Sequence, residues 1–116
     1  MVVEERIYTL KVGKLAEQMK AYEEFGLAAQ KEILGNLVGY YYTEIGALNT
    51  IIHMWAYEDL NDRAARRAKL MGDERFKVYL GKVLPLLERQ ENRIMIPAPF
   101  FEKTLRAMMA AGKAQG

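Results

Sequence analysis

Two runs of aromatic and β-branched residues, separated by a four-residue turn, constrain the fold more than any other feature of this sequence. The first run covers Leu37–Ile45 and the second covers Thr50–Tyr57. Such residues favour strands, and the intervening Gly46–Asn49 segment has the length and the glycine of a hairpin turn. The two runs therefore predict an antiparallel hairpin in the middle of the chain.

A strand and a helix are expected before the hairpin. Val3–Leu10 alternates in polarity with the period of a strand. The next segment carries apolar residues at spacings of three and four, which is the pattern of an amphipathic helix. Gly35 stands where the glycine that ends a helix is expected. The apolar positions of this predicted helix are Leu15, Met19, Tyr22, Phe25, Ala29 and Ile33.

Two helical segments and a strand are expected after the hairpin. Asp59 and Asp73 are suitable N-cap residues for the two segments, and Pro85 ends or bends the second. A last strand is expected at Glu88–Ile96. The order β-α-β-β-α-β predicts an α+β, ferredoxin-like fold, with both helical regions on one face of a four-stranded antiparallel sheet.

The length of 116 residues fits one domain. We expect that domain to cover residues 1–100, followed by a tail over residues 101–116 that is either helical or frayed. The N-terminus lacks the pattern of a signal peptide, and no apolar run approaches the roughly 20 residues of a membrane span. We therefore expect a cytoplasmic protein that does not bind membranes.

Charge and cysteine content exclude several classes of function. The net charge of +2 is too small to indicate nucleic-acid binding. The chain has no cysteine, so disulfides and thiolate metal sites are excluded. With one histidine and no carboxylates at ligand spacing, we expect neither a metal nor a cofactor.

Both faces of the predicted sheet are apolar, although one layer of helices covers only one face. An uncovered apolar face of several hundred Å² is an association site. We therefore expect a homodimer in which two sheets pack face to face about a two-fold axis. The alternative is that the C-terminal tail covers the second face. The alternating sets are Ile52, Met54 and Ala56 against Ile51, His53, Trp55 and Tyr57, and Leu37, Tyr41 and Ile45 against Val38, Tyr40 and Tyr42.

His53 is the candidate catalytic residue. It is the only histidine and shares a strand face with Trp55 and Tyr57. Its ordinary pKa lies near neutrality, so it is a candidate base or a hydrogen-bond donor to a ligand. The alternative is a core histidine that is hydrogen bonded to Glu44 across the hairpin.

Arg6 and Tyr8 alternate on the face of the first strand that also meets the helices. The first and third strands are neighbours in this topology, so these side chains are expected beside His53. An arginine on this face needs a carboxylate, either from Glu44 or Glu91 or from a ligand. The full set of candidate ligand-binding residues is Arg6, Tyr8, Tyr40, Tyr42, Trp55 and Arg93.

A basic run stands on the helix after the hairpin. It could bind phosphate, but acidic residues surround it in the sequence. A solvated, salt-bridged helix face is the preferred interpretation. The run consists of Arg63, Arg66, Arg67 and Lys69.

Five segments together resemble the NIPSNAP family, in order and spacing, from about Glu5 to Phe100. The resemblance implies a dimeric α/β barrel fold, shared with antibiotic-biosynthesis and haem-degrading monooxygenases. It implies no settled activity, and a pocket between sheet and helices is the expected binding site. The matching segments are Glu5–Lys14, Leu37–Gly46, Asn49–Tyr57, Asp62–Ala68 and Gln90–Ile94.

The resemblance to the superfamily also suggests an enzymatic alternative. Trp55 aligns with a strand tryptophan of haem-degrading enzymes, but the histidine that those enzymes carry on the following helix is replaced here by arginines. The alternative is thus a cofactor-independent monooxygenase or an isomerase of a small aromatic or polyketide-like substrate. In that hypothesis His53 is the base, and Arg6 and Tyr8 orient an acidic oxygen of the substrate.

Overall fold

Four strands form one antiparallel sheet in the order β2-β3-β1-β4. The computed structural model describes residues 1–114. The strand order confirms the predicted ferredoxin-like arrangement, in which the first strand lies between the third and the fourth. The strands are β1 (Val2–Leu10), β2 (Asn36–Tyr42), β3 (Thr50–Tyr57) and β4 (Leu87–Met95).

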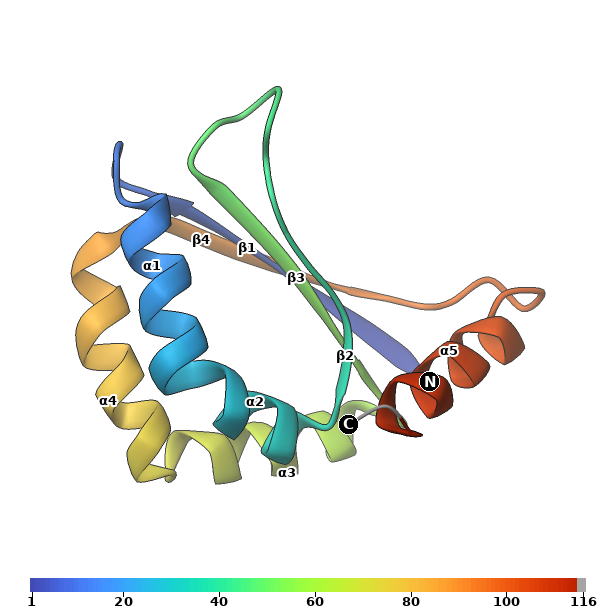
Figure 1. Cartoon of the computed structure of the whole chain (residues 1–116). Coiled ribbons are helices and arrows are strands. Elements are labelled where there is room, and N and C mark those ends of the chain that lie inside the picture. The colour runs from blue at the N-terminus through green and yellow to red at the C-terminus, as the bar shows by residue number, and fades with distance from the viewer. Residues whose placement is uncertain (115–116) are drawn as a thin grey trace.

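The helices from the two crossovers cover one face of this sheet (Figure 1). The first crossover is a continuous helical rod, and the second consists of two helices joined at an angle. Figure 1 shows the last helix, α5 (Glu102–Ala114), on the opposite side of the sheet. The covering elements are α1 (Leu15–Ala21), the π-helical turn η1 (Tyr22–Gly26), α2 (Leu27–Leu34), α3 (Leu60–Met71), α4 (Glu74–Val83) and the short 3-10 turn η2 (Leu84–Leu86).

Local sequence signals set the ends of these helices. The Asp59 carboxylate accepts a hydrogen bond of 2.7 Å from the backbone N–H of Asp62, as an N-cap does. Asp73 caps α4 in the same way. Gly35 ends α2 with a φ of 90°, a conformation that favours glycine. All three capping predictions are confirmed.

The first helical rod contains a π-helical turn that the apolar spacing did not predict. This turn ends at Gly26, where the chain passes close to two aromatic rings. A Cβ atom at this position would lie 2.9 Å from Cδ1 of Tyr22 and 3.0 Å from Cγ of Tyr79. Glycine therefore permits the close packing of the rod against α4.

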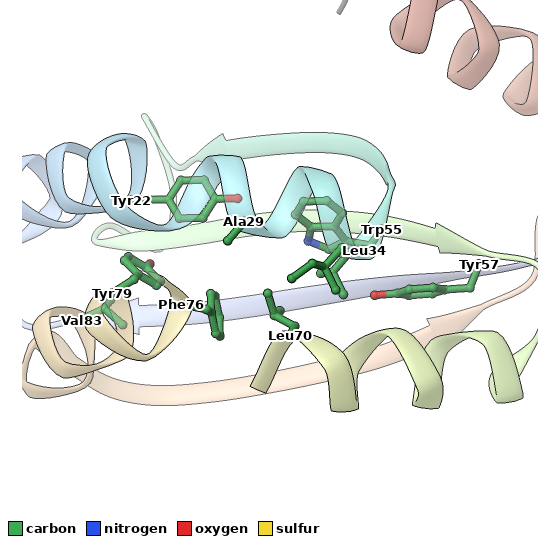
Figure 2. Packing of buried hydrophobic residues seen from close by; sticks show 10 residues of the cluster. Tyr22, Ala29, Leu34, Trp55, Tyr57, Leu70, Phe76, Tyr79 and Val83 are labelled. Atoms are coloured by element: carbon green, nitrogen blue, oxygen red, sulfur yellow. The ribbon is translucent and has the colours of Figure 1, made fainter. Parts of the chain in front are cut away.

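A buried aromatic and aliphatic cluster joins the helices to the sheet (Figure 2). Trp55 and Tyr57 enter it from β3, and helical residues surround them. The rod and the second crossover both contribute, which explains why the two crossovers lie on one face. The buried members are Tyr22, Ala29, Ile33, Leu34, Trp55, Tyr57, Leu70, Phe76, Tyr79 and Val83.

A register shift in β2 makes one sequence prediction wrong. Strict alternation placed Leu37 and Tyr41 on one face and Val38 and Tyr40 on the other. The pairing with β3 shifts between Leu37 and Gly39, as it does at a β-bulge. Leu37 and Tyr40 consequently share the helix-covered face, whereas Val38 packs on the opposite face. β2 also ends at Tyr42, earlier than predicted.

Helix α5 (Glu102–Ala114) packs against one end of the second face of the sheet. Leu105 is buried there against Val3 and Ala56. Ile52 and Tyr41 lie further along the same face and do not belong to this cluster, and Tyr41 is 59% exposed. The tail thus covers part of the face, and the expectation of a frayed end concerns residues 115–116, which lie outside the described residues. Among residues 1–114, no helix is long and apolar enough to cross a membrane.

Candidate functional site

A cavity of about 270 Å³ lies between the sheet and the helices. Side chains of β1, β2 and β3 line one wall, and the rod, α3 and α4 line the other. Three of the lining residues, Met71, Leu84 and Gln90, are exposed, so the cavity reaches the surface between the helices and β4. Its volume is near the lower end of the roughly 300–1,000 Å³ that is typical of small-molecule sites.

His53 forms part of the cavity wall between two tyrosines. Its ring lies 5.3 Å from that of Tyr8 and 4.8 Å from that of Tyr40, measured between ring centroids. The indole N–H of Trp55 donates a 2.7 Å hydrogen bond to Nδ1 of His53. Since Nδ1 accepts this hydrogen bond, a neutral His53 carries its own proton on Nε2. The second ring nitrogen is then a donor.

The surroundings of His53 keep its imidazole neutral. Burial lowers the pKa of His53, and the positive charge of Arg6 lowers it further, to about 3. The carboxylate of Glu4 acts in the opposite direction but does not balance them. A neutral imidazole with its Nδ1 lone pair already engaged is a poor general base and a good hydrogen-bond donor.

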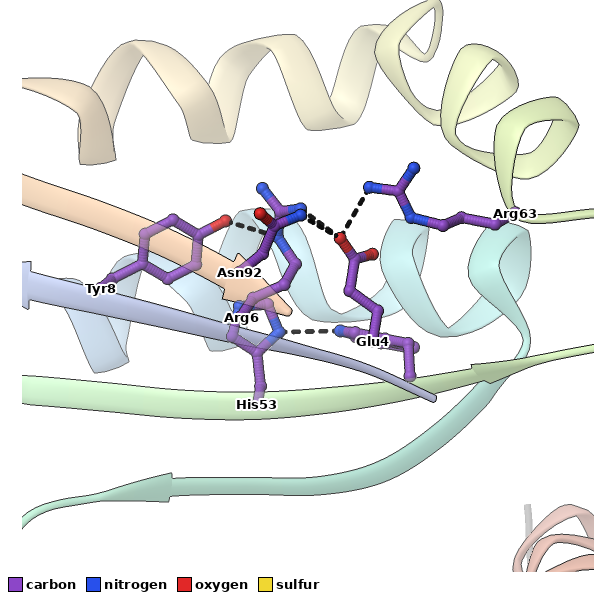
Figure 3. Close-up of polar contacts among 7 residues, drawn as sticks. Glu4, Arg6, Tyr8, His53, Arg63 and Asn92 are labelled. Carbon is purple, nitrogen blue, oxygen red and sulfur yellow. Dashed lines mark hydrogen bonds and ion pairs between the residues drawn. The ribbon is translucent and has the colours of Figure 1, made fainter. Parts of the chain in front are cut away.

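Glu4 is the anionic centre beside the cavity (Figure 3). It is fully buried, and its Oε2 accepts hydrogen bonds from Arg6 at 2.9 Å, Arg63 at 2.7 Å and Asn92 at 2.8 Å. Burial raises the pKa of Glu4, but the hydrogen bonds from Arg63 and Asn92 and the charges of Arg6 and Arg63 outweigh it, so the pKa falls to about 2. Glu4 is therefore ionised at neutral pH.

Arg6 connects this anionic centre to the cavity. One guanidinium nitrogen bonds Glu4, and its Nε donates to the hydroxyl of Tyr8 at 2.8 Å. Because Glu4 lies two residues before Arg6 on the same strand, both side chains point toward the helices. The ion pair holds Arg6 and Tyr8 in place at the cavity wall.

Arg67 lines the cavity from α3 and differs from the other arginines of this helix in its contacts. Among the contacts of residues 1–114, its side chain makes no hydrogen bond and no ion pair, although Arg63 and Arg66 on the same helix make both. Burial lowers the pKa of Arg67, and so does the nearby charge of Arg6. Arginine nevertheless remains charged in proteins.

Gln18 organises the far wall of the cavity. Its side-chain amide donates to the hydroxyls of Tyr40 at 3.0 Å and Tyr79 at 2.9 Å. Its Oε1 is buried and has no hydrogen-bond partner among the described residues. The wall at Gln18 thus contains one unsatisfied acceptor.

The structure brings together most of the residues that the sequence predicted. The cavity is lined by Arg6, Tyr8, Tyr40 and His53. Trp55 does not line it but donates a hydrogen bond to His53. Tyr42 and Arg93 do not line it. Tyr42 is 55% exposed at the edge strand, and Arg93 pairs with Glu5 at 3.0 Å on the opposite face of the sheet.

The predicted partners of these residues were wrong. Glu44 lies exposed in the hairpin loop, and Glu91 is exposed on β4; neither pairs with Arg6 or His53. Glu4 is the carboxylate of Arg6 instead, and its position two residues away was the signal that could have identified it.

The basic run on α3 was also misinterpreted in part. Arg66 pairs with Asp62 at 2.8 Å, as a salt-bridged surface residue does, but Arg63 bonds the buried Glu4 and Arg67 lines the cavity. The one-residue step between Arg66 and Arg67 turns the side chain by about 100° on a helix. That rotation was readable in the sequence. No group of three or more potential metal-ligating residues was found among the described residues.

Comparison with known proteins places this arrangement in a family. The NIPSNAP family model matches residues 3–102. A NipSnap homolog from Dictyostelium discoideum is 33% identical over 96 residues, covering 83% of this chain and 42% of the relative. The chain spans less than half the length of the curated relatives that it matches first.

Solved structures share the fold. A NIPSNAP family protein with unknown function from Agrobacterium tumefaciens superposes with a TM-score of 0.83 at 48% identity, covering 86% of this chain and 90% of that one. An antibiotic biosynthesis monooxygenase superposes with a TM-score of 0.61 at 11% identity, covering 85% and 100% of the two chains. The second likeness is one of fold alone.

Proposed function

The chain belongs to the NIPSNAP family, and we propose that it acts as a homodimeric domain that binds a small molecule between its sheet and its helices. Its biochemical activity within that family is not established. The proposed ligand-binding residues are Arg6, Tyr8, Tyr40 and His53, which line one cavity.

The cavity itself carries this proposal. Buried polar groups normally find partners inside the protein, yet this wall holds an unpartnered Gln18 oxygen and an arginine, Arg67, without an ion pair among the described residues. A packed core would not keep such groups around about 270 Å³ of space. A bound molecule with polar and apolar parts would satisfy both.

Fragment binding tests the proposal. Trp55 is the only tryptophan, so its indole N–H gives one NMR signal that reports on His53. Aromatic fragments that enter the cavity should shift this signal. Leu80→Phe should narrow the cavity and weaken binding, whereas Val78→Phe, on the exposed side of α4, should not, and both variants keep the single indole signal. Binding that survives Leu80→Phe unchanged would contradict the proposed location.

The homodimer is part of the same proposal. Support comes from the second face of the sheet, where Tyr41 remains 59% exposed beyond the end that α5 covers. Light scattering coupled to size exclusion should give twice the chain mass of 13.3 kDa. A mass of one chain at micromolar concentration would contradict it. A cytoplasmic location is proposed as well, and cell fractionation tests it.

The enzymatic alternative has less support. A cofactor-independent monooxygenase or isomerase with His53 as its base needs a basic nitrogen that faces the substrate. Nδ1 of His53 is already engaged by Trp55, and the pKa of the ring is about 3. Oxygen consumption or substrate turnover that is lost in His53→Gln would favour the alternative.

A further inference from the structure

The charged groups that line the cavity are all cations. They are Arg6 and Arg67, and no acidic side chain of residues 1–114 lines the cavity beside them. Arg6 pairs with Glu4 at 2.9 Å, a carboxylate that it shares with Arg63. Arg67 has no such partner among the described residues, so one positive charge in the cavity wall remains uncompensated. A partly buried charge without a partner is unfavourable, and a ligand of opposite charge would offset that cost.

The free hydrogen-bonding groups of the wall are mostly donors. Nε2 of His53 carries the proton of the neutral ring, because Nδ1 accepts from Trp55. The hydroxyl of Tyr8 accepts from Arg6 and therefore keeps its own hydrogen to donate. Tyr40 also accepts from Gln18, but its hydroxyl lies against that of Tyr79 as well. A wall of donors with one positive charge suits a ligand that is rich in acceptors.

The remainder of the cavity is apolar. Leu10, Ile51 and Val83 are buried side chains that line it. Leu80 and Leu87 continue this surface toward the mouth. The volume of about 270 Å³ admits a ring with a short side chain rather than a long acyl chain. A molecule that fits this part of the cavity therefore has a small, apolar body.

From these observations we infer that the ligand is a small organic acid with a flat apolar body, whose carboxylate is held by Arg67 and receives hydrogen bonds from His53 and Tyr8. This inference rests on the proposed function, because it names the ligand class of the same cavity. A carboxylate places one negative charge beside Arg67, which has no ion pair among the described residues. The planar guanidinium also matches a carboxylate in two parallel hydrogen bonds.

Acid and amide pairs of equal shape test the charge directly. The probes are phenylacetate, 3-phenylpropionate and indole-3-acetate, each beside its primary amide. Titration is followed by the Trp55 indole signal for the phenyl compounds and by calorimetry for all. Each acid should bind about ten- to a hundredfold more tightly than its amide, because hydrogen bonds to charged groups contribute that much.

Variants of α3 assign the preference to one side chain. Arg67→Gln should abolish the difference between acid and amide, and Arg67→Lys should retain part of it. Lys69→Gln removes the same charge from the exposed side of the helix and should leave the preference unchanged. Folding of Arg67→Gln is checked by urea denaturation.

The outcomes separate the inference from the proposed function. If acids and amides bind equally, or if the preference persists in Arg67→Gln, the ligand class is wrong while the binding cavity stands. If neither acids nor amides bind at millimolar concentration, both fail. The expected result is a preference for the acids that disappears in Arg67→Gln, is partly retained in Arg67→Lys and is unchanged in Lys69→Gln.

Discussion

Replacing Glu4 with glutamine should destabilise the protein strongly and in a pH-dependent way. Glu4 is the one carboxylate among Arg6, Arg63 and Arg67, and it is fully buried. Its pKa is about 2 in the folded protein and about 4.5 when unperturbed. A difference of about 2.5 corresponds to about 3 kcal/mol of stability at neutral pH, at about 1.4 kcal/mol per pKa unit.

The sign of the pH dependence follows from the lowered pKa. The unfolded chain takes up a proton near pH 4.5 while the folded protein resists until about pH 2. The stabilisation is thus complete above about pH 5 and is lost as the pH falls toward 2. Glutamine cannot titrate, so the difference between wild type and Glu4→Gln should shrink from about 3 kcal/mol at pH 7 to about 1 kcal/mol at pH 3.

Urea denaturation at the two pH values measures this difference. Glu5→Gln is the matched control, since Glu5 is the next residue on β1 but pairs with the exposed Arg93 on the opposite face. A surface pair of this kind contributes about 1 kcal/mol or less. The reasoning is refuted if Glu4→Gln and Glu5→Gln lie within about 1 kcal/mol of each other at pH 7, or if the Glu4→Gln deficit is the same at pH 3.

Three further predictions concern the site and its supports. The carbon-bound ring protons of His53 should show no titration by NMR between pH 8 and 5, because burial and the adjacent arginine lower its pKa to about 3; a midpoint near 6.5 would contradict this. Gly26→Ala should lose about 1–3 kcal/mol in urea denaturation, since its Cβ would lie 3.0 Å from Cγ of Tyr79; a gain of the kind that alanine gives in most helices would contradict it. Leu105→Ala should lose about 2 kcal/mol or more because this side chain of α5 is buried against Val3 and Ala56 of the sheet, whereas the exposed Met108→Ala should change little; equal effects would show that α5 does not pack as described.

The fold was predictable from the sequence because its signals are local. Alternation in Val3–Leu10, the turn before Thr50 and the caps at Asp59 and Asp73 each act within a few residues. They specify the number and order of elements, and the ferredoxin-like topology follows. The family resemblance pointed to the same fold independently.

Other features depend on contacts that are distant in the sequence. The bulge beside Gly39 changes the face of the sheet to which the following side chains of β2 point, and strict alternation cannot detect this change. The π-helical turn at Gly26 depends on the fit against Tyr79 from α4. The role of Arg67 was missed because a helical arginine between acidic residues normally faces solvent.

Part of the site was nonetheless predictable. Arg6 and Tyr8 point to the same face of β1, and the pairing of Arg6 with His53 across β1 and β3 confirms that Arg6 and His53 are neighbours. The carboxylate was assigned to distant residues, although Glu4 had the right period and the shortest separation. Whether these residues bind a ligand stays a prediction.

A crystal structure of the protein grown with phenylacetate tests the central claim most directly. The account predicts one molecule in the cavity between sheet and helices, with its carboxylate within hydrogen-bond distance of Arg67 and its ring against Ile51 and Val83. A cavity closed by side chains, or a molecule whose carboxylate points to the mouth at Gln90 and away from Arg67, would contradict the account.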